Sequence, residues 1–350
     1  MRATPARIAE YRSARRARLL STRVNAVLAT IIRRLLQTVV VMLVMSALVF
    51  VGIYLVGDPI SMLASPEATE AQRDAIRASL GLDLPLWRQY LVFMGQAVQG
   101  DFGNSFLTGE PAMRLILQRA PATLELAITA MLLSVLIGVP LGIRAGLKPQ
   151  AVSSRAIMTG SVLGFSLPNF WVGLMLIMVF AVTLGWVPAS GRGQTVAIGS
   201  LNLSIFTVSG WLSLALPAIT IAMAKCATII RVTRAATRES LPMDYIKFAR
   251  AKGLSERRVL GVHLLKNILI PIVTVAGLEF GQVVAFAVVT ETVFSWPGMG
   301  KLLIDSIINL DRPVVVAYLL LIVFFLVMLN LVVDIIYTVL DPRVRLEGRR

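Results

Sequence analysis

Six long apolar stretches, separated by polar and charged segments, dominate the pattern of the chain. A helix needs about 20 mostly apolar residues to cross the roughly 30 Å of hydrocarbon in a bilayer, and each stretch is long enough. The stretches run from Leu35 to Val56, from about Ala122 to Ile143, between Arg155 and Arg192, between Arg192 and about Ile230, from about Ile268 to Val293, and from about Val314 to Leu340. The third and fourth also contain polar residues, so we expect one helix plus a loop in each. The pattern predicts an all-α polytopic membrane protein with a six-helix transmembrane bundle.

The composition requires a lipid environment for much of the chain. Hydrophobic residues make up 57% of the 350 positions and charged residues 15%, whereas an ordinary soluble domain has about 25% charged residues. The single cysteine, Cys226, cannot form an internal disulfide, and the single histidine, His263, cannot build a metal site alone. No nucleophile and base occur together at helical spacing. We therefore expect no catalytic residues, no metal site and no cofactor bound by this chain.

The basic residues are distributed unevenly between the two sets of connections. If the N-terminus lies in the cytoplasm, 26 of the 34 Lys and Arg residues fall in inside segments and 8 in outside segments. Membrane insertion retains basic loops on the cytoplasmic side, so both termini are predicted to be cytoplasmic. The net charge of +15 is then explained by topology, and no nucleic-acid partner is expected.

Three segments outside the apolar stretches have patterns of their own. The exterior connection 57–121 contains amphipathic stretches from Ala68 to Leu80 and from Leu84 to Val98, which indicate a small cap or surface helices. The exterior segment Ser295–Arg312 opens with a Trp-Pro-Gly turn signal that ends the fifth helix, and it is a candidate lining for one end of a pathway. The basic N-terminal tail, residues 1–32, fits either an amphipathic helix on anionic lipid or a disordered segment.

The inside connection 231–266 is polar yet helical in pattern. An aromatic and small-residue face lies beside a basic one at i, i+3 and i+4 spacing: Tyr245, Phe248, Ala249 and Lys252. Pro242 is the expected start of this helix, Gly253 its end, and Ser255 the start of a second helix. Such a helix, glycine break and helix predict a docking surface for a partner. The alternative is a basic segment that lies on lipid headgroups.

This loop and several other stretches resemble one family. Within the loop the similar residues are Asp244-Tyr245-Ile246, Ala249-Arg250-Ala251-Lys252-Gly253-Leu254, and His263 to Pro271. Elsewhere they are Asp101-Phe102-Gly103, Pro121 to Leu126, Pro168-Asn169-Phe170-Trp171, Gly185 to Gly191, Glu291 to Gly300, and Asp341 to Arg345. In this order the stretches resemble the inner-membrane permeases of binding-protein-dependent ABC importers, in the dipeptide, oligopeptide and nickel branch. The resemblance covers about Arg33 to Arg345.

The resemblance implies a transmembrane permease domain over residues 33–345, with the bundle of the type I ABC importer class, and a cytoplasmic tail at 346–350. It also implies a bacterial inner-membrane complex with a second homologous permease, two ABC ATPase subunits that bind ATP and Mg²⁺, and a periplasmic or lipid-anchored substrate-binding protein. The implied ATPase-coupling loop comprises Asp244, Tyr245, Phe248, Ala249, Arg250, Ala251, Lys252, Gly253 and Leu254. The chain has no Gly-x-x-x-x-Gly-Lys-Ser/Thr loop, so we expect ATP hydrolysis on the partner subunits and not here.

The resemblance implies peptide uptake, with nickel, glutathione or another small solute as alternatives on the same machinery. Three positions depart from the family pattern. Lys247 stands where the wider superfamily often has Glu, Glu279 stands where a neutral polar residue is expected, and Lys225 stands where an apolar one is expected. The last two departures bear on the cargo.

Polar residues within the predicted spans are costly in lipid, so they should face protein or water. Glu279, Gln282 and Phe286 share one face of the fifth helix, which either lines a translocation pathway or seals a helix contact. We also expect Asn330 and Asp334, on one face of the sixth helix, to form a structural cap or a bond between helices.

Two charged residues near the ends of spans are expected to leave the hydrocarbon. Glu125, near the outer end of the second helix, is predicted to reach the headgroups, and Lys225 is predicted to snorkel towards the inner surface.

Two other function classes remain open. An ion-coupled secondary transporter would rely on Glu279, Glu291 and Asp334, although no inverted repeat is visible. A membrane scaffold without transport would leave the helix-glycine-helix loop unexplained.

Overall fold

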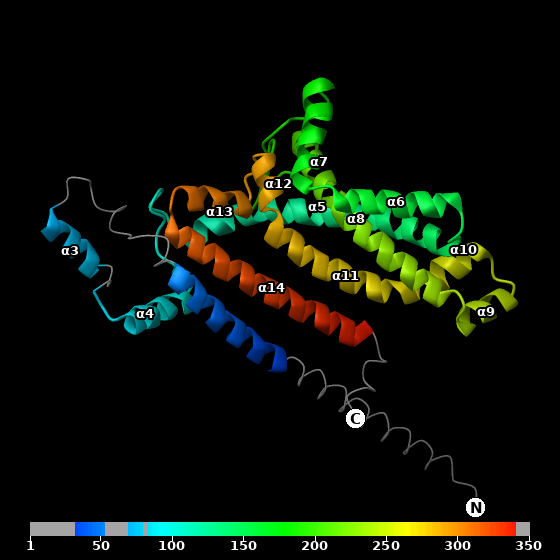
Figure 1. Ribbon diagram of the computed structural model, residues 1–350, viewed down its shortest axis with the longest axis horizontal. Coiled ribbons are helices and arrows are strands. Elements are labelled where there is room, and N and C mark those ends of the chain that lie inside the picture. The colour runs from blue at the N-terminus through cyan, green and yellow to red at the C-terminus, as the bar shows by residue number, and fades with distance from the viewer. Residues whose placement is uncertain (1–31, 53–68, 80–82, 200, 341–350) are drawn as a thin grey trace, which may run out of the picture.

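The computed structural model describes residues 32–52, 69–79, 83–199 and 201–340, which form a bundle of helices (Figure 1). The predicted N-terminal tail up to residue 31, residues 53–68 of the exterior connection, and the C-terminal segment from 341, with its Asp-Pro-Arg motif, lie outside the described residues. In chain order the elements are a first helix (Ile32–Gly52), α3 (Glu70–Ser79), α4 (Leu86–Val98), α5 (Ala112–Leu147), α6 (Val152–Ser166), α7 (Asn169–Leu176), the π-helix η1 (Ile177–Thr183), β1 (Val196–Ile198), β2 (Leu201–Leu203), α8 (Val208–Ser240), α9 (Asp244–Ala251), α10 (Glu256–Arg258), the π-helix η2 (Val259–Leu264), α11 (Leu265–Phe286), α12 (Val288–Val293), α13 (Met299–Ile308) and α14 (Arg312–Leu340).

Five helical runs within the described residues are long and apolar enough to cross a membrane. They are the first helix, α5, α8, the run Glu256–Phe286 and α14. A sixth span results if α6 and the helix that follows it are counted as one. The predicted number of spans is therefore reached only with this bent pair.

The third apolar stretch was expected to hold a single helix, and this expectation is wrong. The helix Val152–Ser166 and the helix Asn169–Thr183 meet at an angle of 99°. Between them Leu167 is extended, with φ −80° and ψ 134°, and Pro168 follows. Proline lacks an N–H and forces the preceding residue out of the helical region, so the helix cannot continue through this point. As a result, α7 projects from the layer formed by α5, α6 and α8 (Figure 1).

The two longest helices extend further than the apolar stretches predict. α5 begins at Ala112 rather than near Ala122, and α8 ends at Ser240 rather than near Ile230. The additional turns carry arginine side chains. Hydropathy identifies only the part of a helix that lies in hydrocarbon, whereas the backbone hydrogen bonds of the helix continue into the polar region.

The centre of the bundle is the close contact between α5 and α8. Glycines at every fourth position of α5, Gly138, Gly142 and Gly146, face α8. A Cβ atom added to Gly142 would lie 2.5 Å from the Cβ of Thr233 and 2.9 Å from the carbonyl oxygen of Ile230. Small residues at this spacing let two membrane helices approach closely, so that van der Waals packing holds them together where the hydrophobic effect contributes little. The helices α6, α7 and α11 then pack against α8.

A buried tryptophan fastens the end of the fifth apolar stretch to α5. The predicted Trp-Pro-Gly turn does end this stretch, because α12 ends at Val293 and α13 begins at Met299. Trp296 is fully buried, and its Nε1–H donates to the carbonyl oxygen of Ala122 at 2.9 Å. Trp296 itself faces the helical core and not a pathway, whereas the prediction that the segment Ser295–Arg312 lines one end of a pathway stays a prediction.

The two predicted amphipathic stretches form α3 and α4, which confirms the prediction of surface helices there. α4 is held to the first helix by a hydrogen bond between the hydroxyls of Ser46 and Tyr90, 2.8 Å apart, and by the rings of Phe50 and Tyr90, whose centroids are 5.3 Å apart. The helices α3 and α4 lie at the opposite end of the bundle from α9 and α10 (Figure 1).

The glycine contact between α5 and α8 can be tested with a matched pair of alanine substitutions. Gly142→Ala should destabilise the protein by about 1–3 kcal/mol, because the added methyl group overpacks the contact with Thr233. Gly160→Ala is the control, since it lies within α6 and no atom would come within 4 Å of its Cβ. The apparent melting temperature of the detergent-solubilised protein should fall for the first variant only. Equal melting temperatures for the two variants would show that the contact is less tight than described.

Candidate functional site

The loop between α8 and α11 is built from short helices with a core of their own. The helix α9 begins at Asp244, after Met243 as its N-cap residue, so Pro242 lies in the turn before it and the predicted helix start is two residues early. Side chains from α9, η2 and α11 form the buried cluster: Ile246, Ala249, Val259, Leu264, Ile268 and Ile272. Partly buried residues of α5 and α8, among them Val139 and Ala236, pack against this cluster. The loop is therefore attached to the two central helices by apolar packing.

The end of α9 has the geometry that the glycine predicts. Gly253 has φ +75°, in the left-handed region that other residues adopt only with strain. The N–H of Gly253 donates to the carbonyl oxygen of Arg250 at 2.9 Å, and the N–H of Leu254 donates to that of Ala249 at 3.3 Å. This pair of bonds is a Schellman motif, which ends a helix and reverses the chain. Ser255 then precedes α10, as predicted.

The predicted coupling residues divide between the inside and the outside of the loop. Ala249 is 3% exposed and packs in the loop's own core, so the expectation that its methyl group meets a partner is wrong. The outward-facing residues are Asp244, Tyr245, Phe248, Arg250, Ala251, Lys252 and Gly253, with Leu254 half-buried. Phe248 is 61% exposed, and the Nζ atom of Lys252 lies 4.6 Å from the centre of its ring. Arg250 is paired with Glu256 at 2.8 Å. The loop thus presents an aromatic side chain beside basic ones.

A second group of polar residues lies between α8 and α11. The Nζ atom of Lys225 is 2.6 Å from Oε2 of Glu279 and 3.4 Å from Oε1 of Gln282. The side chains of Lys225 and Glu279 are 20% and 16% exposed. Lys225 and Glu279, the two residues within the spans that depart from the family pattern, therefore form an ion pair with each other. The expectation that Lys225 snorkels away is wrong, because a carboxylate on the neighbouring helix offers a closer partner than the headgroups.

The predicted fifth-helix face includes this ion pair. Glu279, Gln282 and Phe286 lie on α11, and Phe286 is 74% exposed. An ion pair at membrane depth that remains partly open must face other protein or a water-filled space, because lipid cannot solvate it. The face therefore has the polarity of a pathway or of a contact with another subunit.

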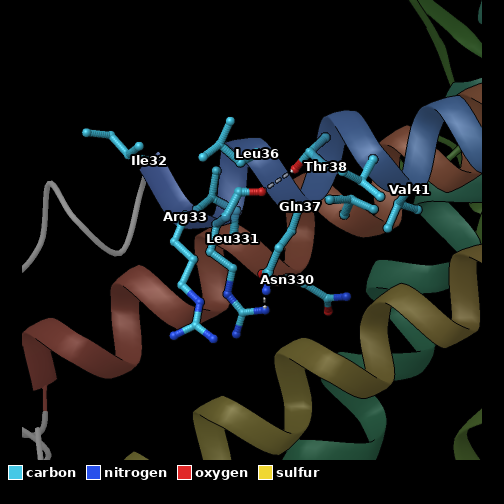
Figure 2. Close-up of a pocket in the computed structure, with 11 residues that line it drawn as sticks. Ile32, Arg33, Leu36, Gln37, Thr38, Val41, Asn330 and Leu331 are labelled. Atoms are coloured by element: carbon cyan, nitrogen blue, oxygen red, sulfur yellow. Dashed lines mark hydrogen bonds between the residues drawn. The ribbon is translucent and has the colours of Figure 1, made fainter.

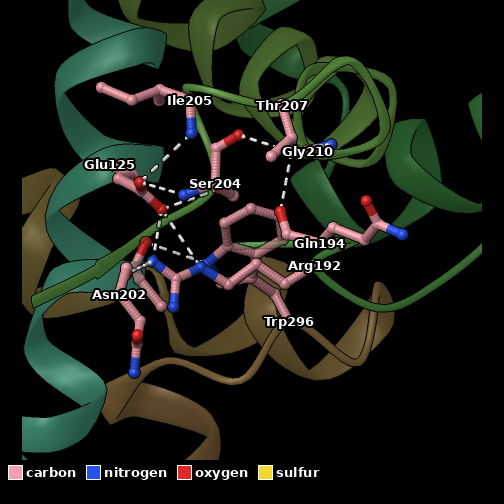
Figure 3. A network of polar contacts seen from close by, with 10 residues as sticks. Glu125, Arg192, Gln194, Asn202, Ser204, Ile205, Thr207, Gly210 and Trp296 are labelled. Atoms are coloured by element: carbon pink, nitrogen blue, oxygen red, sulfur yellow. Dashed lines mark hydrogen bonds and ion pairs between the residues drawn. The ribbon is translucent and has the colours of Figure 1, made fainter. Parts of the chain in front are cut away.

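At the other end of the bundle, Glu125 organises the loop between α7 and α8 (Figure 3). Its carboxylate is 6% exposed and accepts hydrogen bonds from Arg192 Nη2 at 2.5 Å and from the backbone N–H of Ser204 at 2.7 Å. Arg192 also donates to the carbonyl oxygen of Asn202 at 2.6 Å and lies over the ring of Trp296. The prediction that Glu125 reaches the headgroups is therefore wrong.

The same loop holds a short β-hairpin that the sequence pattern did not predict. Val196–Ile198 pairs antiparallel with Leu201–Leu203. The hairpin consists of three residues in each strand, and its β2 strand leads directly into the Ser204 that binds Glu125. Strands this short are not distinguishable from a loop by alternation of apolar and polar residues, because alternation needs four or more positions to be recognised. The sequence signal that identifies this part of the site is an acid within the span of α5, Glu125, together with an arginine in the loop before α8, Arg192.

The remaining acids in the spans are each engaged by a different partner. Asp334 lies 2.7 Å from Nη2 of Arg34 on the first helix, which confirms the predicted bond between helices. Glu291 is fully buried and accepts from the hydroxyl of Thr123 at 2.6 Å and from the backbone N–H of Lys301 at 2.9 Å. Among the described residues, no three His, Cys, Asp or Glu side chains lie close enough together to hold a metal ion.

Together, the membrane-length helices define a polytopic helical membrane protein, and the loop between α8 and α11 has an apolar core and an exposed aromatic and basic face. Residues 138–346 match the family described as the binding-protein-dependent transport system inner membrane component, and residues 27–127 match the corresponding N-terminal region. The chain therefore belongs to this family, which forms the membrane permease component of ABC importers. The predicted fold class and the resemblance are both confirmed.

Several characterised proteins are similar along most of their length. The di/tripeptide transport system permease protein DppB of Pseudomonas aeruginosa (strain UCBPP-PA14) is 42% identical over 315 residues, covering 86% of this chain and 94% of that protein. The oligopeptide transport system permease protein AppB of Bacillus subtilis (strain 168) is 38% identical over 289 residues, covering 82% and 90%. The glutathione transport system permease protein GsiC of Escherichia coli (strain K12) is 39% identical over 302 residues, covering 86% and 94%.

Proposed function

We propose that this chain is the permease subunit of an ATP-driven importer that takes up di- or oligopeptides. It forms the pathway with a second, homologous permease in the bacterial inner membrane. Two of the three similar proteins are named for peptide transport, and the third is named for glutathione, itself a small peptide. Glutathione therefore remains the alternative cargo that these relatives favour, ahead of nickel.

The loop α9–η2 carries the mechanistic part of the proposal. ATP and Mg²⁺ bind to two ATPase subunits, and the exposed face of α9 inserts into a groove on one of them. Phe248 and Tyr245 supply apolar contact area, while Lys252 and Arg250 supply charge. Because Ile246 and Ala249 are packed into a core shared with α5 and α8, a displacement of α9 moves these helices as well. A rigid element that another subunit's ligand can shift is what alternating access requires.

The face of α11 that carries Glu279, Gln282 and Phe286 lines the translocation pathway in this proposal. The ion pair with Lys225 supports this assignment, because it lies at membrane depth yet is partly open. A peptide carries an ammonium and a carboxylate, so opposite charges in the wall offer a partner to each end. A binding protein at the exterior side, near α3 and α4, delivers the cargo.

Phe248→Asp tests the coupling role. The substitution leaves the core of the loop intact but removes an aromatic contact area, and it should lower peptide uptake and binding-protein-stimulated ATPase activity together by about tenfold, a loss of roughly 1.4 kcal/mol at the interface. Lys247→Gln, at an exposed neighbour on the same helix, is the matched control. Both activities are measured in one reconstituted complex. Normal stimulation by the Phe248→Asp protein would rule out this loop as the coupling element.

Gly253 extends the same test to the backbone. Gly253→Val should uncouple ATP hydrolysis from uptake, because a β-branched residue is strained at φ +75° and tilts α9. Gly253→Asn should retain most of the coupling, since asparagine tolerates the left-handed region. Ala249→Asp is expected to reduce assembly as well as coupling, because it places an unpaired charge in the loop's own core. Similar coupling in the valine and asparagine variants would contradict the proposed role of the Schellman turn.

Substitutions can distinguish whether the ion pair between Lys225 on α8 and Glu279 on α11 contacts the cargo or only holds the two helices together. Glu279→Gln should leave stimulated ATPase activity intact and change the affinity or preference for peptides severalfold, because the carboxylate no longer meets the cargo. The double substitution Lys225→Met with Glu279→Met removes both charges and should assemble normally, since no charge is left unpaired. Uptake of charged-terminus peptides should remain impaired in the double variant. Full recovery of uptake would identify the pair as structural.

The orientation of the chain forms a further prediction. The excess of basic residues in one set of connections supports cytoplasmic termini, and the placement of α9 at the opposite end from α3 and α4 agrees with this topology. Reporter fusions at Pro66 and Gln194 should read exterior, and a fusion at Ser255 should read interior. Alkaline phosphatase and fluorescent-protein activities measure the two sides. An interior reading at Gln194 would overturn this topology.

A further inference from the structure

A groove of about 950 Å³ lies between the first helix and α14 (Figure 2). Its wall on the first helix includes Arg33 and Gln37, and its wall on α14 includes Asn330 and Leu331 (Figure 2). Apolar side chains of both helices, among them Val40, form most of its lining. Neither the transport pathway nor the coupling loop described above includes this groove.

The charges at the mouth of the groove are not balanced. Arg34 is paired with Asp334 at 2.7 Å and donates to Gln37 at 3.2 Å. Arg33, one position earlier, is exposed, and among the described residues its side chain has no hydrogen-bond or ion-pair partner; the same holds for the amide of Asn330. Two cations and one carboxylate leave the mouth with one positive charge.

The groove also lies at a defined depth in the membrane. The described part of the uncharged run, from Leu35 to Gly52, is about 27 Å long at 1.5 Å per residue, close to the thickness of the hydrocarbon. Arg33 therefore lies at the level of the lipid headgroups, and the lining that follows it, from Leu36 to Val41, lies alongside the acyl chains. A groove that is cationic at headgroup depth and apolar below matches a lipid that has an anionic headgroup and an acyl chain.

We propose that this groove binds an anionic phospholipid of the same leaflet, with its phosphate on Arg33 and an acyl chain along Leu36, Val40 and Val327. Asn330 is placed to donate to an ester or glycerol oxygen just below the phosphate. An acyl chain fills the space with van der Waals contacts that an empty or water-filled groove would lack. The bound lipid then joins the first helix to α14 from the side that faces the membrane.

The charge pattern disfavours the chain's own N-terminal segment as the occupant. Residues 1–31 contain seven arginines and a single acid, Glu10, so they would repel Arg33 rather than pair with it. The same segment instead adds to the attraction of this region for anionic lipid, which is worth about 1 kcal/mol per basic residue near the surface.

Native mass spectrometry of the intact, solubilised transporter complex tests the proposal. The probes are phosphatidylglycerol and phosphatidylcholine with identical acyl chains. Wild-type protein should retain phosphatidylglycerol more tightly than phosphatidylcholine. Arg33→Gln should weaken phosphatidylglycerol by about fivefold, the loss expected for one basic residue at the surface, and leave phosphatidylcholine unchanged. Arg155→Gln, at another exposed arginine, is the control for net charge.

A second pair of variants tests the acyl-chain part of the site. Val40→Trp fills the groove and should weaken both lipids, whereas Val44→Trp, which lies one turn further along and does not line the groove, should weaken neither. Glycerol 1-phosphate, a headgroup without a chain, should not displace phosphatidylglycerol. Equal lipid binding by Arg33→Gln and Arg155→Gln, or by the two tryptophan variants, would overturn the proposal. Displacement by glycerol 1-phosphate, or occupation of the groove by a second permease, would do the same.

Discussion

The close approach of α5 to α8 is the contact on which the arrangement of the other helices depends. Three glycines on α5 remove the side chains that would hold the backbones apart, and Thr233 and Ile229 of α8 fill the space. The helices α6, α7 and α11 pack on α8, and α14 packs on both α5 and α11. A change of a few tenths of an ångström here would be transmitted to both ends of the bundle, because close-packed helices cannot deform locally.

Charged residues in this bundle tie together segments that are distant in the sequence. Glu125 joins α5 to the loop before α8, Lys225 joins α8 to α11, and Asp334 joins α14 to the first helix. An unpaired charge at these depths is expensive, so each pairing selects one arrangement of its two elements over others. The same cost makes Arg33, which has no hydrogen-bond or ion-pair partner among the described residues, suited to an anionic ligand.

The loop between α8 and α11, which we propose couples ATP hydrolysis to transport, combines two properties that have separate physical origins. Its inward face, with Ile246 and Ala249, is part of the apolar packing of α5 and α8. Its outward face leaves Phe248 in the open beside Lys252. A loop that was merely basic would lie on headgroups without such a core. The packing makes the loop an extension of the central helices, and the exposed aromatic ring makes it suited to a protein partner.

The sequence by itself determined the local features of this protein. Runs of apolar residues located the spans, amphipathic spacing located α3, α4 and α9, and Gly253 and Ser255 located helix ends, because these signals depend only on neighbours within a few positions. It could not predict which charged side chains meet. Glu125 and Lys225 were each expected to move towards the headgroups, since a single span gives no information about the arginine or carboxylate that another segment supplies.

The tertiary structure alone decided how the spans are bent and paired. The third stretch was expected to hold one helix, whereas the structure breaks it at Pro168, and the two helices on either side, both packed on α8, meet at 99°. The inward direction of Ala249 and the burial of Trp296 likewise depend on neighbours far along the chain. Helix formation in a membrane is local because each backbone group bonds within its own segment, whereas the choice of facing side chains depends on packing between segments.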